Sequence, residues 1–263
     1  MSIWTDGLTV SRKQWDKYIT LVRAINDKAA YELELWMQHR DSIGMDFLDY
    51  DTNGMNIFDA AYYIAEKYSN ASAAVAVQLC EAMAEATGVP MLEAELAENP
   101  SYNEIAKTVQ GVMNTSRNRA EISSAVGRLV KRTGARTVRR NAARNGAQYA
   151  WVPSGDTCAW CIMLAGKGWQ YERNSDHKEH IHSNCDCNYA IRFDNKTQIA
   201  GYDPEAYADQ YREADGSTRD EKLNSMRRKY YAEHKEEILA QKADAYAKRQ
   251  ELNSSQAVET DIN

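Results

Sequence analysis

The side chains best suited to metal chemistry in this chain lie within one short stretch. Cys158 and Cys161 form a Cys-x-x-Cys pair, and Cys185 and Cys187 follow about twenty-five residues later. A Cys-x-x-Cys turn places two thiolates on one side of a tight loop, and a second pair can complete a tetrahedron around zinc. His182, three residues before Cys185, can replace any one thiolate. The spacing predicts a structural zinc site and leaves open which four groups bind the metal.

Other uses of these thiols are weighed against zinc. Stable disulfides are not favoured, because the first twenty residues are polar and lack the apolar segment of a signal peptide. A catalytic zinc is suggested by His177-Lys-Glu179, which resembles the His-x-Glu of zinc deaminases, but its order relative to the Cys-x-x-Cys pair is reversed. Unbound or redox-active cysteines stay an alternative. Cys80 stands alone in an alanine-rich segment and is predicted to be a core residue.

Charge is distributed unevenly along the chain. The formal net charge is −6, but residues 41–107 hold twelve acidic and two basic side chains, whereas residues 117–144 hold nine basic and one acidic. One face should therefore attract anions and another should repel them. No apolar run approaches the eighteen residues that a membrane span needs, so no membrane partner is expected.

The N-terminal half is predicted to be helical. Ser11 can cap a helix whose apolar residues, from Trp15 to Trp36, recur at helical spacing. An alanine-rich second helix, residues 57–87, should pack closely against it and end at Gly88. Ser101 and Glu104 read as a capping box that starts a third helix. Residues 49–54 match the opening of a calcium-binding loop, but Ala60 stands where the bidentate glutamate is needed, so a turn is predicted.

A basic segment leads into the cysteine-containing stretch. Gly134 and Gly146 are both plausible helix-ending glycines, so two short helices are predicted. Their cations either contact nucleic-acid phosphates or pair with the acidic N-terminal half, and both interpretations stay open. The residues concerned are Arg128, Lys131, Arg132, Arg136, Arg139, Arg140 and Arg144.

Around the cysteines, a short helix over 157–165 and a small hairpin are predicted. The hairpin is suggested by the alternation of Trp169 and Tyr171, and of Tyr189, Ile191 and Phe193. After Phe193 the chain becomes a densely charged helical arm that begins at Asp203-Pro204. The predicted fold is mainly α with a small zinc-stapled α+β knuckle. The predicted parts are a helical N-terminal domain (1–112), the knuckle domain (113–195), and the charged arm with its tail (196–263).

The run from Gly134 through Asp156 to Cys161, followed by His182-Ser-Asn-Cys185-Asp-Cys187, resembles the Mu F-like head-morphogenesis domain of tailed bacteriophages. The resemblance covers roughly residues 117–194. Two positions depart from the family pattern: Val138 replaces a common acidic residue, and Ser183 replaces a common proline. Roles tied to those two positions are therefore not carried over.

The resemblance implies a minor structural protein of the phage head, assembled in the host cytoplasm and located in the virion head. It implies the portal or major capsid protein as partners, together with packaged double-stranded DNA. It does not imply an enzyme. Two alternatives are kept: a zinc-stabilised nuclease using His180, His182 and Asn184, and a free DNA-binding regulator using the basic helices.

Overall fold

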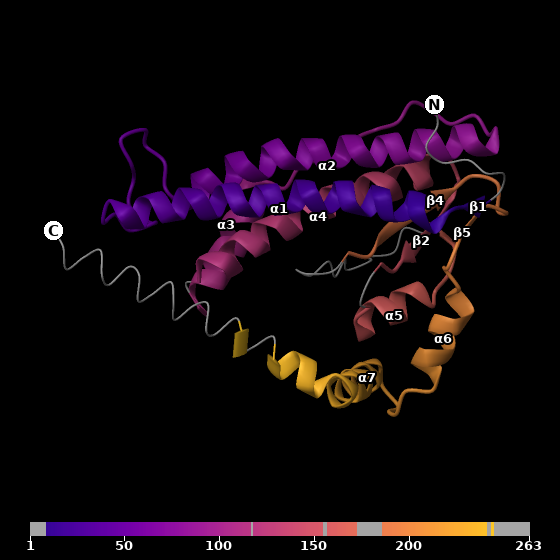
Figure 1. Ribbon diagram of the computed structural model, residues 1–263. Helices are drawn as coiled ribbons and strands as arrows, with labels where there is room; N and C mark the ends of the chain where they lie inside the picture. Colours follow the sequence, from indigo (N-terminus) through magenta and orange to yellow (C-terminus); the bar gives the residue numbers. More distant parts are fainter. Residues whose placement is uncertain (1–8, 117, 155–156, 173–185, 241–242, 245–263) are drawn as a thin grey trace.

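The computed structural model describes residues 9–116, 118–154, 157–172, 186–240 and 243–244 (Figure 1). Within these residues the chain is mainly helical, as predicted. The helices are α1 (Arg12–Ser42), α2 (Ile57–Thr87), α3 (Tyr102–Met113), α4 (Arg119–Arg144), α5 (Ala159–Ala165), α6 (Pro204–Arg212) and α7 (Arg219–Glu233). The strands are β1 (Thr9–Val10), β2 (Gln148–Val152), β3 (Gln170–Tyr171), β4 (Asn188–Arg192) and β5 (Gln198–Ile199).

The two long N-terminal helices begin at capping residues. The Ser11 hydroxyl accepts a hydrogen bond from the Gln14 backbone N–H, and the Ser11 backbone N–H donates one to Gln14 Oε1. Helix α2 begins at Asn56 in the same reciprocal manner and ends at Gly88 in the left-handed conformation. The predictions for both helices are confirmed. At α3, Ser101 caps the helix, while the Glu104 carboxylate pairs with Arg132 of α4.

Helix α4 corrects the prediction of two short basic helices. It runs without interruption from Arg119 to Arg144, and Gly134 lies inside it. A Cβ atom built on Gly134 would lie 2.6 Å from the Ser72 hydroxyl and 3.1 Å from the Ser72 carbonyl oxygen of α2. This glycine therefore permits close helix packing and does not end a helix. At Gly127 the backbone carbonyl of Asn26 in α1 is similarly close, at 3.2 Å.

The long helices and the sheet share a buried core. Figure 1 shows α1 and α2 side by side over α4, with the sheet beside one end of this bundle. One cluster joins the N-terminal part of α1 and the C-terminal part of α2 to the sheet, and includes Trp15, Leu79 and Trp151. A second fills the far end of the bundle, around Leu33 and Ile105. Burial of these apolar surfaces supplies the main favourable free energy of folding.

The sheet corrects the prediction of a simple hairpin. Strand β2 lies between β3 and β4, and both pairings are antiparallel. Tyr149 of β2 pairs with Ile191, and Trp151 pairs with Tyr189. All five residues of β4 are buried, so the predicted alternation of exposed and buried side chains is absent there. This strand lies between the helices and β2, and both of its faces are covered.

The charged C-terminal segment is partly anchored to the rest of the protein. Helix α6 begins at Asp203-Pro204 as predicted, and a Cβ at Gly166 would lie 2.8 Å from the backbone of Ala208, so α5 and α6 meet closely. The Tyr202 hydroxyl donates a hydrogen bond to the Ala165 carbonyl at 2.8 Å. Neither C-terminal helix is deeply buried: α6 has no buried residue, and Leu223 is the one buried residue of α7. The proposed boundaries at 112 and 195 stay predictions.

Candidate functional site

Three of the four clustered cysteines lie in the described part of the chain. Cys158 is exposed at the N-cap of α5, so the helix starts two residues later than predicted. Cys161 lies inside α5, and Cys187 directly precedes β4. The side chains of Cys161 and Cys187 are buried in the same core cluster, and neither forms a disulfide.

The predicted zinc site is not completed by these residues alone. Cys185 and His182 lie outside the described residues, as do His180 and Asn184 of the nuclease alternative. Among the described residues, no three His, Cys, Asp or Glu side chains gather closely enough to hold a metal. The donors nevertheless fit in type, because three thiols, Cys158 and Cys161 at the first turn of α5 and Cys187 just before β4, are of the kind that structural zinc prefers. The zinc ligand set stays a prediction.

Cys80 provides a useful contrast with the clustered thiols. It is buried in α2 within the apolar core, as predicted. Burial, reinforced by the nearby Glu81 charge, raises the pKa of its thiol to about 12. Because the thiolate is the nucleophile and metal ligand, Cys80 is a chemically inert core residue.

The basic side chains of α4 are largely engaged with carboxylates of the same chain. Arg139 forms a two-point ion pair with Glu172, with N–O distances of 2.9 and 2.7 Å. Arg140 and Arg144 both contact the Glu95 carboxylate at 2.8 Å. Of the seven predicted nucleic-acid-binding residues, one, Arg140, is exposed and one, Lys131, is buried. The other five are half-buried. The pairs with Glu95 are of the kind that the intramolecular interpretation requires, whereas Glu172 lies outside the acidic N-terminal half. Contact with phosphates stays a prediction.

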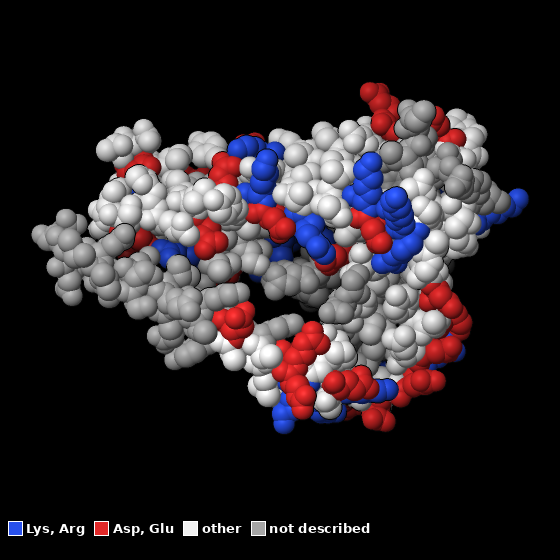
Figure 2. All heavy atoms as spheres, in the orientation of Figure 1, with Lys and Arg blue, Asp and Glu red and all other residues white. Residues whose placement is uncertain are grey.

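The acidic stretch after α2 is bound along the length of α4. Its backbone N–H groups at Leu92, Glu95 and Ala97 donate to the side chains of Asn145, Asn141 and Thr137 respectively. The predicted separation into an attracting and a repelling face is therefore reduced, because acid and base lie against each other. On the face shown in Figure 2, basic and acidic side chains are interspersed over the helices.

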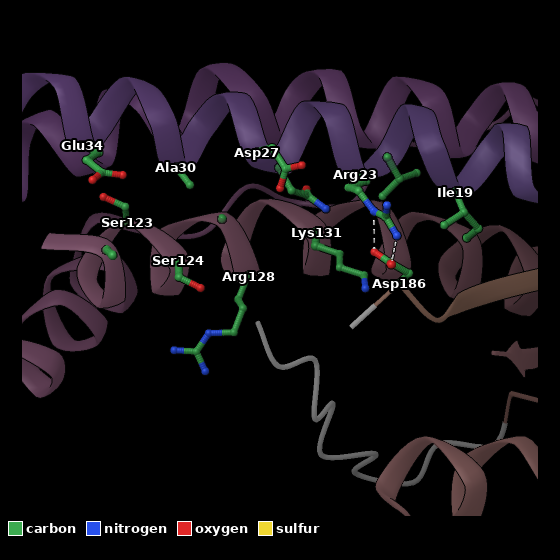
Figure 3. Close-up of a pocket in the computed structure, with 14 residues that line it drawn as sticks. Ile19, Arg23, Asp27, Ala30, Glu34, Ser123, Ser124, Arg128, Lys131 and Asp186 are labelled. Carbon is green, nitrogen blue, oxygen red and sulfur yellow. Dashed lines mark hydrogen bonds and ion pairs between the residues drawn. The ribbon is translucent and has the colours of Figure 1, made fainter. Parts of the chain in front are cut away.

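A groove of about 440 Å³ lies between α1 and α4 (Figure 3). Arg23 of α1 donates from Nε to Asp186 Oδ1 at 2.9 Å, which ties the residue between Cys185 and Cys187 to the helical bundle. Arg128 points away from α1 in Figure 3. Three cations and three carboxylates line the groove, so it carries no net preference for an anion. They are Arg23, Arg128, Lys131, Asp27, Glu34 and Asp186.

Sequence reasoning missed several features that position these side chains. Strand β2 was not predicted, although its run of Tyr149, Ala150, Trp151 and Val152 between Gly146 and Pro153 is typical of a strand. The partners Glu95 and Glu172 were also missed, since no local spacing links them to α4. The α1–α4 groove depends on close helix packing at Gly127, which has no signal in a single sequence.

In the described part of the chain, no helix is both long and apolar enough to cross a membrane.

Comparison with known proteins adds one family match. A family model described as VG15 protein matches residues 9–214. No curated protein and no solved structure gives a significant match.

The fold is that of a mainly helical protein with a small antiparallel sheet and a cluster of cysteines in the sequence between the start of α5 and β4. The family match extends from β1 to the end of α6 and so includes both the long helices and the sheet. The chain belongs to the VG15 protein family. This is a family of viral gene proteins, and membership is consistent with a phage protein.

Proposed function

We propose that this chain is a minor structural protein of a tailed bacteriophage head that acts in capsid or portal assembly. The observation that carries the proposal is the incomplete burial of the C-terminal helices. Helix α6 has no buried residue, and α7 has only Leu223. Tyr230 and Tyr231 of α7 are exposed, and so is Leu239 beyond the end of this helix. A segment of this kind suits a protein that gains further contacts in an assembly.

Family membership and architecture support the same proposal. The family is viral, and the sequence around the clustered cysteines resembles a head-morphogenesis domain. The long α1, α2 and α4 helices form a tightly packed scaffold, and several basic side chains of α4 pair with carboxylates from the segments that lie against it. This arrangement favours a structural role over a free regulator, whose recognition helix would need exposed base-reading side chains.

We further propose one structural zinc per chain, held by Cys158, Cys161, Cys185 and Cys187, with His182 as the alternative ligand. Zinc would tie the start of α5 to the start of β4, two places far apart in the sequence. The protein's own residues already fix that region, because β4 pairs with β2 and Asp186 pairs with Arg23. A metal there would stabilise the sheet and would not take part in a reaction.

Contact with packaged double-stranded DNA is the more demanding part of the proposal. A phosphate contact by Arg132, Arg139, Arg140 or Arg144 would require that cation to exchange an intramolecular carboxylate for a phosphate. A salt titration of DNA binding tests this, since each neutralised phosphate adds about 0.9 to the logarithmic slope. Arg136→Ala/Arg140→Ala should lower that slope, and an unchanged slope would reject DNA contact through α4.

Inactivation of the gene in the phage tests the head-assembly role. We expect infected cells to make the major capsid protein normally but to release few infectious particles, with aberrant or empty heads visible by electron microscopy. Complementation in trans with the wild-type chain should restore them. Normal heads and normal titres without this chain would reject the proposal and favour the regulatory or nuclease alternatives.

A further inference from the structure

In Figure 1 the loop between α1 and α2 lies at the end of the helical bundle away from the sheet. An exposed group of tyrosines lies on this loop and near the starts of α2 and α3. Tyr50, Tyr63 and Tyr102 are 67%, 58% and 45% exposed. The ring of Tyr62 joins two of them, with centroids 5.7 Å from Tyr63 and 5.6 Å from Tyr102. We call these four side chains the tyrosine face. Exposed aromatic clusters of this kind are typical of protein interaction surfaces.

The tyrosine face is assembled from three separate segments. Tyr50 lies in the loop between α1 and α2, Tyr62 and Tyr63 lie in the second turn of α2, and Tyr102 starts α3. The Tyr102 hydroxyl donates to Asp59 Oδ1 at 3.1 Å, which fixes α3 against α2. Burial, the Asp59 contact and the nearby Tyr50 phenol raise the pKa of Tyr102. The rings of Tyr62, Tyr63 and Tyr102 therefore form one packed cluster, and the Tyr50 phenol lies near Tyr102.

The loop that carries Tyr50 is held in place although it has no regular structure. The buried guanidinium of Arg40 donates to the carbonyl oxygens of Asp46 and Asp49. The Asp51 carboxylate accepts from the backbone N–H groups of Asn53 and Met55, at 2.8 and 2.9 Å. A surface that is already ordered loses little conformational entropy when a partner binds.

The charge around the tyrosine face selects the kind of partner. Residues 41–66 contain six acidic side chains and no Lys or Arg, and two of the six face cations from elsewhere, since Asp41 pairs with Arg119 and Asp51 lies 4.0 Å from Arg40. The flanking cations are engaged, because Arg40 is buried against the loop and Lys67 pairs with Glu32 at 2.8 Å. Such a surface repels DNA phosphates and anionic lipid headgroups. It attracts a guanidinium group, which stacks on aromatic rings and pairs with carboxylates.

We propose that the tyrosine face is a docking site for an arginine-bearing segment of a partner protein. Arginine is favoured over lysine because its planar, weakly hydrated head group can lie flat on a phenol ring while it donates to Asp59, the carboxylate that contacts Tyr102. The proposal goes beyond the head-assembly role and does not depend on it, since it concerns the chemistry of this surface alone.

Titration of the full chain with short model peptides tests the proposal. The probes are a capped Gly-Arg-Gly-Arg-Gly-Arg peptide and the matching lysine peptide, followed by NMR chemical shifts at low salt. We expect the arginine peptide to shift signals around Tyr50, Tyr63 and Tyr102, and to bind several-fold more tightly than the lysine peptide. Tyr50→Ala/Tyr63→Ala should weaken its binding about tenfold.

A matched control separates the tyrosine face from any exposed tyrosine. Tyr31→Ala removes a side chain that is equally exposed, at 61%, in the middle of α1, and should leave binding unchanged. Equal binding by the double variant, or equal affinity for the lysine peptide, would overturn the proposal. Analytical ultracentrifugation tests whether a second copy of this chain binds the tyrosine face instead. Self-association that is lost in Tyr50→Ala/Tyr63→Ala would assign the surface to a second copy and would also overturn the proposal. Neither result would bear on the gene-inactivation experiment.

Discussion

Gly134→Ala tests the close packing of α4 against α2. In an exposed helix, replacement of glycine by alanine stabilises by about 0.8–1 kcal/mol. Here the added Cβ would lie 2.6 Å from the Ser72 hydroxyl and 3.1 Å from its carbonyl oxygen, and Ser72 is buried. Overpacking of this kind costs about 1–3 kcal/mol. The two effects together predict a net loss of about 0–2 kcal/mol.

Gly111→Ala is the matched control for this prediction. Gly111 lies in α3, and a Cβ there would meet nothing within 4 Å. It should therefore show the helix-propensity gain without the clash. The difference in unfolding free energy between the two alanine variants isolates the packing cost, about 1–3 kcal/mol. Urea denaturation monitored by circular dichroism gives both values on the same scale.

A double variant shows whether Ser72 is the source of the clash. Ser72→Ala/Gly134→Ala removes the 2.6 Å contact with the hydroxyl and keeps the 3.1 Å contact with the carbonyl oxygen. It should recover at least about 0.5 kcal/mol relative to the sum of the single changes. If Gly134→Ala stabilised the protein as much as Gly111→Ala does, α4 would not pack on α2 at the observed distance, and the reasoning would be refuted.

The remaining predictions concern ion pairs, a helix cap and the metal. The Arg139 side chain is 14% exposed and forms a two-point ion pair, so Arg139→Ala should destabilise the protein by about 1.5–3 kcal/mol. The Arg140 side chain is 43% exposed, so Arg140→Ala should cost about 0.2–1 kcal/mol. Urea denaturation measures both values. Hydrogen bonds from the backbone N–H of Thr218 and from Ser217 lower the pKa of Glu221 to about 2. Its capping of α7 should therefore be complete above the unfolded pKa of about 4.5 and lost as the pH falls through about 2. NMR titration measures this loss, and Glu221→Gln should remove the pH dependence. Elemental analysis should find about one zinc per chain, which is lost in Cys158→Ser and kept in Cys80→Ser. Loss of the metal should unfold the region locally, because structural zinc contributes on the order of 10 kcal/mol to the free energy of folding. Absence of zinc, with all four clustered thiols alkylated in the native protein, would contradict this prediction.

The sequence predicted the parts of the fold that depend on local signals. Ser11, Gly88 and Asp203-Pro204 each mark a helix boundary through backbone hydrogen bonds or fixed dihedral angles within a few residues. These boundaries are observed where the residues place them. The Asn-Gly turn before α2 is likewise local, because Asp51 bonds to the backbone of the next residues.

The parts that failed depend on tertiary contacts. Gly134 has the same local signature as a helix-ending glycine, and only the nearness of Ser72 in α2 shows that it serves packing. Strand β2 takes its central position from pairing with β4, about forty residues away. The partners of the α4 cations could not be predicted, because Glu95 and Glu172 are distant in the sequence and come close to Arg140 and Arg139 only in the folded chain. Spacing in the sequence identified the clustered thiols, but spacing alone does not determine which groups bind a metal.

Quantitative mass spectrometry of gradient-purified phage particles tests the central claim most directly. If the chain is a minor head protein, it should be present in intact particles at far fewer copies than the major capsid protein, and should withstand high-salt washing of the particle surface. Detection in infected-cell lysate together with consistent absence from purified particles would contradict the structural assignment.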